Sequence, residues 1–171
     1  MQEEARKQRN TQRMKECFPA FAARLVNVIK DMETAGFRPR IQDAHRSIAD
    51  QLKAFESGNS TVTFGFHNVT GKDGRPESLA VDLIDDDHPL SSGRKYVITL
   101  AAIAQRHGLH SGIFFFSGKL PAARRTALKA DLQKAIDAGN VDPKVKIGFD
   151  PTHIEATGVT IAAAKAGKRP D

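Results

Sequence analysis

Cysteine and tryptophan are almost missing from this chain of 171 residues, which contains one cysteine and no tryptophan. The single thiol, Cys17, cannot form an internal disulfide or a cysteine-rich zinc module. It stands beside a stripe of apolar residues, which indicates a small buried side chain rather than a nucleophile. Long apolar runs are missing too, because the longest, residues 112–116, is far shorter than the roughly 18 residues of a membrane span.

Tyrosine is also rare, and the ten phenylalanines are spaced mostly as core residues. The chain carries 26 basic and 20 acidic residues, for a net charge of +6. Basic residues exceed acidic ones in segments 1–16, 117–149 and 165–171. This distribution fits a polyanionic partner, either nucleic acid, an anionic membrane surface or an anionic cell-wall polymer, or else ordinary lysine-rich helices. Few aromatics alternate with arginines as base-stacking surfaces require, so we expect no nucleic-acid partner.

The length predicts one domain with additions at its ends. We expect residues 1–16 to form a separate, loosely attached basic arm or helix, because Pro19 fits only in the first turn of the helix that follows. Residues 17–160 form the predicted domain, with a basic helical segment at about 117–146. Residues 161–171 form a predicted tail, disordered at its end.

Apolar spacing and glycine positions divide the domain into helices and strands. Because strands alternate with helices after a helical start, the sequence predicts an α+β fold. The expected elements are helices at 18–35, 48–57, 96–107, 121–138 and 159–166, and strands at 37–44, 79–84, 109–116 and 147–156.

Three residues far apart in the sequence are candidate metal ligands: His67, Asp82 and His153. Asp82 interrupts an apolar run, where a buried carboxylate is costly unless it is paired or binds a metal. It could instead lie at a strand end and face water, and the histidines could be ordinary core residues. Two imidazoles and one carboxylate suit a single catalytic Zn²⁺, with the fourth position open to water.

Two further residues could complete a hydrolytic site. Asp150 could accept a proton from water, and Arg46 could stabilise negative charge that develops on a carbonyl oxygen. Asp150 could also be a plain turn residue, and Arg46 a surface charge. Glu155 could replace Asp150 as the base, or orient a metal ligand from behind. His45, beside Arg46, is a candidate substrate contact.

The order of these motifs resembles a known family. Arg46 and Ser47 with Gln51 are followed by His67, an Ala-Val-Asp strand ending in Asp82, a helix, a Gly-Leu turn and an Asp-x-x-His strand. This order is similar to that of the zinc D,D-peptidase and L-alanyl-D-glutamate peptidase family, whose fold is shared by Hedgehog signalling domains. Here His67 and Asp82 are fifteen residues apart, whereas seven is usual in the family, and residues 70–78 read as an inserted loop.

The resemblance implies a small antiparallel sheet flanked by helices and one bound zinc. It implies that His67, Asp82 and His153 bind the metal, that Asp150 is the base and that Arg46 polarises the scissile carbonyl, with Gln51 and Ser47 near the substrate. The implied substrate is the peptide stem of bacterial peptidoglycan. Aspartate at position 150 favours the L-alanyl-D-glutamate endopeptidase branch.

The polar N-terminus has no signal-peptide pattern. We therefore expect synthesis in the cytoplasm, and action at the cell wall after lysis or after delivery by a secretion machine, as for an endolysin or an antibacterial toxin. A toxin would have an inhibitor protein as a partner.

Other interpretations stay open. The same fold could bind zinc or wall peptide without turnover, or the chain could be a basic nucleic-acid-binding module with incidental histidines. The acidic run at residues 85–88 could bind a divalent cation, although such a run is more often a solvated turn. His107 and His110 have expected structural roles at a helix end.

Overall fold

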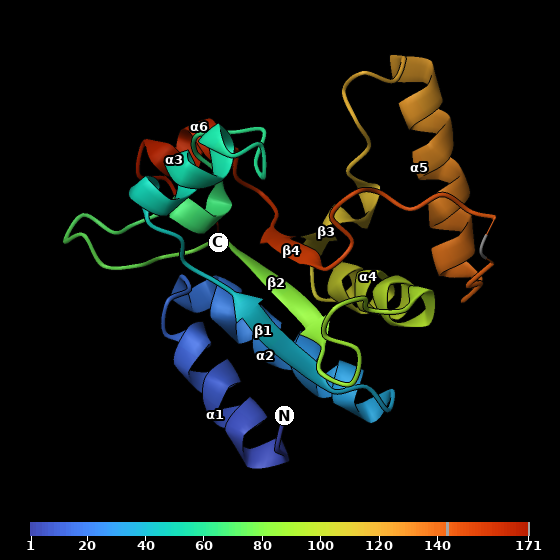
Figure 1. Ribbon diagram of the computed structural model, residues 1–171, viewed down its shortest axis with the longest axis horizontal. Helices are drawn as coiled ribbons and strands as arrows, with labels where there is room; N and C mark the ends of the chain where they lie inside the picture. The colour runs from blue at the N-terminus through green and yellow to red at the C-terminus, as the bar shows by residue number, and fades with distance from the viewer. Residues whose placement is uncertain (143, 171) are drawn as a thin grey trace.

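The computed structural model describes residues 1–142 and 144–170. Within them, six α-helices surround one four-stranded antiparallel sheet in a single α+β domain (Figure 1). The predicted fold class is therefore confirmed. None of the described helices combines the length and apolarity needed to cross a lipid bilayer.

The sheet has the strand order β1-β2-β4-β3. Its strands are β1 (Pro39–Asp43), β2 (Ala80–Asp85), β3 (Leu109–Ser111) and β4 (His153–Ala156). Side chains alternate between the two faces of a strand. One face therefore carries buried apolar residues such as Val81, Leu83 and Ile154, whereas the other carries Asp82 of β2 with His153 and Glu155 of β4.

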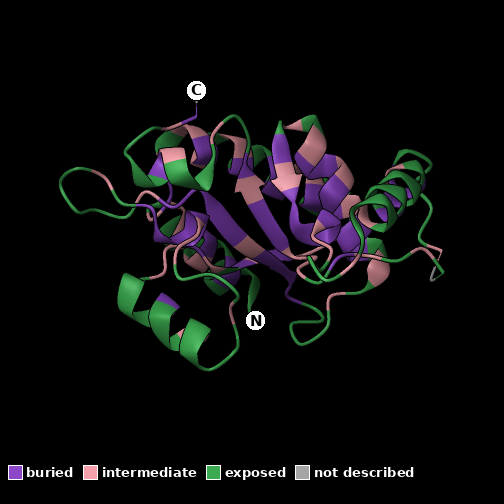
Figure 2. Ribbon diagram, turned by 90° about the horizontal axis from the view of Figure 1, so that it is seen from above, coloured by how far each residue is buried: buried purple, intermediate pink, exposed green. Residues whose placement is uncertain are grey.

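Helices α2 (Pro19–Thr34) and α4 (Arg94–Arg106) cover the apolar face of the sheet. Pro19 occupies the first turn of α2, as its missing N–H and fixed φ favour. Gly36, with φ of 86°, ends α2 in the left-handed conformation that glycine adopts at low cost. Figure 2 shows the sheet and these helices as the buried centre of the molecule.

The remaining helices lie at the margins: α1 (Glu3–Met14), α3 (Ile48–Glu56), α5 (Ala122–Asp137) and α6 (Ile161–Lys165). Helices α3 and α6 lie together at one end of the sheet, and α5 packs on α4 (Figure 1).

The N-terminal segment forms the helix α1, but the expectation of loose attachment is wrong. The side chain of Arg6 is 1% exposed and donates to Pro39 O at 2.6 Å. Asn10 donates to the same carbonyl at 3.0 Å and accepts from Ile41 N at 2.8 Å. Polar side chains of α1 thus satisfy backbone groups at the free edge of β1, which would otherwise lack partners.

The predicted strand at 109–116 is shorter than expected. Strand β3 ends at Ser111, and Gly112–Phe114 forms a 3-10 helix. A Cβ atom at Gly112 would lie 2.9 Å from His153 Cβ and would also collide with the Asp150 carbonyl. Only glycine admits this close approach of the Asp150 turn, which breaks the strand.

The C-terminal segment is fixed rather than disordered over its described residues. Arg169 donates to Glu77 Oε2 at 2.7 Å and to Thr70 O at 2.6 Å. These bonds hold the tail against the loop at 70–78. A bond from Glu77 N to Val69 O at 2.9 Å closes the base of this loop, so the residues on either side of it stay together.

Candidate metal centre

The sheet register brings the predicted ligands to one face. Asp82 on β2 lies directly across from His153 on β4. Glu155, two residues further along β4, pairs with His110 of β3. Directly opposed residues share a face, so all four side chains project from the sheet on the side away from α2 and α4.

His67 approaches this face from a 3-10 helix, Phe66–Asn68. Its Nε2 lies 3.2 Å from His153 Nδ1 and 3.6 Å from Asp82 Oδ1, and His153 Nδ1 lies 3.4 Å from Asp82 Oδ1. Tetrahedral zinc with bonds of about 2.0–2.1 Å separates its ligand atoms by roughly 3.3–3.4 Å. The three residues could therefore hold a metal ion, as the sequence predicted.

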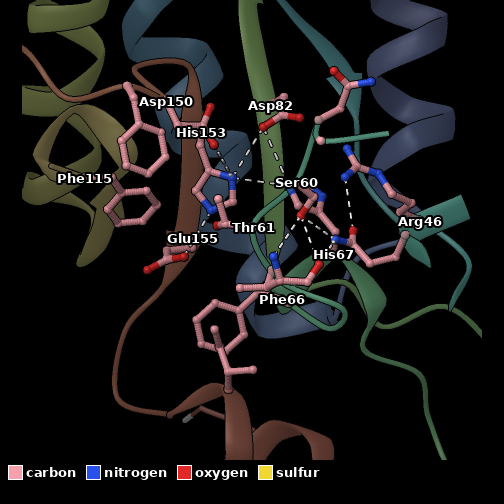
Figure 3. A pocket seen from close by; sticks show the side chains of 17 residues that line it. Arg46, Ser60, Thr61, Phe66, His67, Asp82, Phe115, Asp150, His153 and Glu155 are labelled. Atoms are coloured by element: carbon pink, nitrogen blue, oxygen red, sulfur yellow. Dashed lines mark hydrogen bonds and ion pairs between the residues drawn. The ribbon is translucent and has the colours of Figure 1, made fainter. Parts of the chain in front are cut away.

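Hydrogen bonds on the outer side fix both imidazole rings. His67 Nδ1 donates to Ala44 O at 2.5 Å, and His153 Nε2 donates to Glu155 Oε2 at 3.0 Å. A neutral imidazole has one N–H, so each inner nitrogen presents a lone pair. Two lone pairs and a carboxylate then face one another (Figure 3), an arrangement that needs a cation at its centre.

The pKa values of His153 and Asp82 also indicate that this site requires a positive charge. Burial lowers the pKa of His153, but its bonds to Asp82 and Glu155 outweigh this and raise the pKa to about 10. For Asp82, burial raises the pKa, while the bonds to His153 and His67 lower it well below its usual range. The carboxylate is thus ionised, and a proton or a metal must balance its charge.

Glu155 is held on both of its oxygens. Oε2 accepts from His153, and Oε1 lies 3.2 Å from His110 Nδ1. Burial raises the pKa of Glu155, but its bonds to His110 and His153 outweigh it and lower the pKa to about 2. A carboxylate of such low basicity is a poor proton acceptor, and its place behind His153 is that of an orienting group.

Asp150 differs from Glu155 in that its side chain is more exposed and its pKa is raised rather than lowered. Its side chain is 43% exposed, and Oδ2 lies 3.9 Å from His153 Nδ1 at the edge of the ligand trio. Burial is the main cause that raises its pKa above the usual value. A raised pKa makes its carboxylate a stronger base than an ordinary aspartate.

Arg46 lies on the other side of the trio, held by two neighbours. Nη2 donates to Asp43 Oδ2 at 2.9 Å, and Nη1 donates to Gln51 Oε1 at 3.1 Å. Gln51 is 3% exposed and also donates to Val62 O at 2.7 Å. Gln51 therefore positions both Arg46 and the 60–62 loop.

Two predicted substrate contacts lie apart from this arrangement. The Ser47 hydroxyl accepts from Asp50 N at 3.1 Å and caps α3. The His45 side chain is partly buried, and burial lowers its pKa. Neither residue lines the cleft described next, whereas Arg46 and Gln51 do.

A cleft of about 580 Å³ opens above the ligand trio. Figure 3 shows His67, Asp82 and His153 pointing toward one another, with Arg46 on one side and Asp150 and Phe115 on the other. The Phe115 ring lies 5.5 Å from that of His153. The cleft thus combines a metal-ligand set, a carboxylate and a guanidinium with an apolar wall.

Sequence reasoning missed Asp43, the Ala44 carbonyl and the role of Gly112. Asp43 holds Arg46, Ala44 fixes the His67 ring, and Gly112 admits the Asp150 turn. Gly112 left a signal, since it interrupts a run of strand-forming residues. The Ala44 carbonyl left none, because a backbone acceptor has no sequence signature.

Comparisons with protein-family models, with curated proteins and with solved structures returned no match for this chain. The chemistry of the cleft must therefore be argued from its own residues.

Proposed function

We propose that this protein is a zinc-dependent peptidase that hydrolyses peptide bonds in the stem peptides of bacterial peptidoglycan. The observation that carries the proposal is the trio itself: three ligand atoms 3.2–3.6 Å apart, with the outer nitrogen of each imidazole held by Ala44 O or by Glu155. Zinc fits this donor set because it accepts imidazole nitrogen and carboxylate oxygen in a tetrahedral arrangement.

A zinc ion held by His67, Asp82 and His153 would supply Lewis acidity that makes water reactive near neutral pH. Asp150 accepts the proton that this water loses, since its carboxylate lies beside the trio and has a raised pKa. Arg46 stabilises the negative charge that develops on the carbonyl oxygen. Glu155 keeps the His153 ring oriented throughout.

The substrate class rests on the resemblance of the motif order to the zinc D,D-peptidase and L-alanyl-D-glutamate peptidase family. The cleft is compatible with an extended peptide. Its rim carries uncharged polar residues 59–61, and Phe115 and Phe149 supply apolar surface for side chains. As an endolysin or a delivered toxin the enzyme would meet this substrate at the cell wall, and a toxin would have an inhibitor protein.

A domain that binds zinc or wall peptide without turnover is the competing interpretation. It gives no reason for a carboxylate of raised pKa beside the trio, or for a guanidinium held at the opposite side by Asp43 and Gln51. The Asp150→Asn substitution separates the two, since it preserves the size of the side chain but removes the base.

The test is mass spectrometry of the products released from purified sacculi. We expect zinc-dependent release of stem-peptide fragments that stops when a chelator is added. Asp150→Asn should retain zinc and lose about 10²–10⁴-fold in rate. The matched control, Asp73→Asn in the exposed 70–78 loop, should cut normally. Wild-type rates in Asp150→Asn would exclude Asp150 as the base, and no release by the zinc-loaded wild type would favour the binding domain.

A further inference from the structure

A second hollow, of about 450 Å³, lies between α5 and the segment that follows it. Arg124 and Lys134 from α5 line it together with Lys144 and Lys146. Asp131 is the single carboxylate in the lining. We refer to these four cationic side chains as the basic surface.

Helix α5 and the segment that follows it, which together form the basic surface, are both held in place by the rest of the domain. Leu132 and Ile136 of α5 belong to the hydrophobic core and fix the helix on α4. Arg94, at the start of α4, donates from Nη2 to Asp142 O and to Val145 O, each at 2.7 Å. These bonds keep Lys144 and Lys146 next to α5 rather than on a free loop.

No ion pair in the described part of the chain involves any of the four cationic groups, and with Asp131 the lining carries a net charge of +3. Two acids outside the lining accept hydrogen bonds from uncharged donors. Asp137 accepts from Gln133 Nε2 at 2.8 Å, and Asp142 accepts from the Lys144 backbone N–H at 2.8 Å. Four clustered like charges cost folding energy through mutual repulsion, and an anionic ligand relieves that repulsion.

The position of the surface leaves the cleft free. In Figure 1, α5 stands at the opposite side of the molecule from α3 and α6, and the view in Figure 2 agrees. The cleft is bordered by Gln51 of α3 and Ile161 of α6. A ligand at the basic surface therefore does not compete with a substrate in the cleft.

We propose that the basic surface binds the phosphodiester backbone of an anionic cell-wall polymer and so holds the enzyme on its insoluble substrate. The choice of a wall polymer rests on the proposed peptidase function. The lining contains no aromatic side chain on which the bases of a single-stranded nucleic acid could stack. Of its apolar residues, Leu128 and Ala135 are buried and Val145 is partly buried against the core, so the lining presents no fully exposed apolar side chain for insertion into a bilayer.

The test is co-sedimentation with sacculi that carry or lack their phosphodiester polymer, in an Asp150→Asn background that removes hydrolysis. The variant Lys134→Gln/Lys144→Gln/Lys146→Gln should lose at least about tenfold in affinity for polymer-bearing sacculi. Its slope of log affinity against log salt should be shallower by about two, since about 0.7 counterion is released per contact on a flexible chain. The matched control is Lys30→Gln/Lys72→Gln/Lys168→Gln, which removes three exposed lysines elsewhere and should bind normally.

Equal binding to stripped sacculi, or an equal loss in the control, would overturn the proposal. So would tighter binding of duplex DNA or of anionic vesicles than of the polymer at the same salt concentration. Thermal melting checks that both triple variants are folded. With Asp150 restored, the basic-surface variant should cleave soluble muropeptides normally, which separates failure of this proposal from failure of the peptidase function.

Discussion

The two ends of β2 both carry carboxylates, yet their surroundings are opposite. Asp82 lies toward one end of the strand beside two histidine nitrogens, His67 Nε2 and His153 Nδ1. Asp86 follows the other end and lies within 2.7 Å of Arg40 and 3.1 Å of the amino terminus. Strand β1 and the N-terminus thus bring fixed cations to Asp86, whereas β4 and the 66–68 3-10 helix bring titratable imidazole rings to Asp82.

This contrast shows why the number of acidic residues does not predict a metal site. The run at 85–88 contains three aspartates and a histidine, but the charge of Asp86 is already balanced, and Asp85 accepts from the Asp87 backbone and contacts His88. A metal needs ligands whose charge is unbalanced and whose lone pairs converge. Only the Asp82 end meets this requirement among the described residues.

The largest expected effect follows from removing a ligand at the Asp82 end. His153→Ala should weaken zinc binding by more than the roughly 100-fold that loss of an outer partner causes, because a direct ligand is lost. His88→Ala, at the other end of the same strand, should leave zinc affinity unchanged. Competition titration with a chromophoric chelator measures both. Equal affinity in the two variants would contradict the contrast.

A change at the Asp86 end should affect stability and not zinc. The Asp86 side chain is 3% exposed, so Asp86→Asn leaves Arg40 without its buried counter-charge. We expect a loss of about 3 kcal/mol in unfolding free energy, the range for breaking a buried ion pair. Urea unfolding of the metal-free protein measures this loss. An unchanged midpoint, or a loss of zinc affinity, would show that the two ends are not independent.

Changing Glu155, which accepts the outward hydrogen bond of His153, should have a smaller effect on zinc affinity. Glu155→Gln keeps a hydrogen-bond acceptor but removes the negative charge behind the ring, so zinc affinity should fall about 10–100-fold. Glu77→Gln, whose carboxylate contacts Arg169 away from the cleft, serves as the control. Isothermal titration calorimetry with zinc at fixed pH measures the affinity of both variants. A larger loss in Glu155→Gln than in His153→Ala would reverse the assigned order of importance.

Acid should loosen the Asp86 end through Glu3, which shares the Arg38 side chain with Asp86. The bond from Arg6 is the largest cause that lowers the Glu3 pKa from 4.5 to about 2. A pKa depressed by folding stabilises the folded state above about pH 4.5, and this contribution is lost as the pH falls toward 2. Amide exchange in α1, corrected for intrinsic rates, should therefore accelerate over this window in wild type and change less in Glu3→Gln. An equal response in both chains would exclude Glu3 as the cause.

The ligand trio could be predicted because Asp82 interrupts an apolar strand and because the order of the motifs resembles that of a zinc peptidase family. Alternation along a strand puts His153 and Glu155 on one face, and in the structure the two side chains are hydrogen-bonded to each other. The orientation of the rings could not be predicted, because it depends on the Ala44 carbonyl and on bonds between distant segments. The opposite pKa shifts of Asp150 and Glu155 likewise come from tertiary neighbours.

The main error at the N-terminus has a physical cause. A helix rich in charge is typical of a solvated arm, so Arg6 and Asn10 gave no sign of burial. They are buried because β1 is an edge strand whose backbone groups need partners, and α1 supplies them. Segment 117–146 has a similar composition, yet most of its cationic side chains, including Arg124, Lys134, Lys144 and Lys146, are exposed. Composition alone therefore does not distinguish a buried basic segment from an exposed one.

The most direct test is an anomalous difference map at the zinc absorption edge from crystals of zinc-loaded protein. The proposed centre predicts one strong peak about 2.0–2.2 Å from His67 Nε2, His153 Nδ1 and an Asp82 carboxylate oxygen, with one further position open toward the cleft. A peak beside residues 85–88, or no peak between the two imidazoles at full zinc loading, would contradict it.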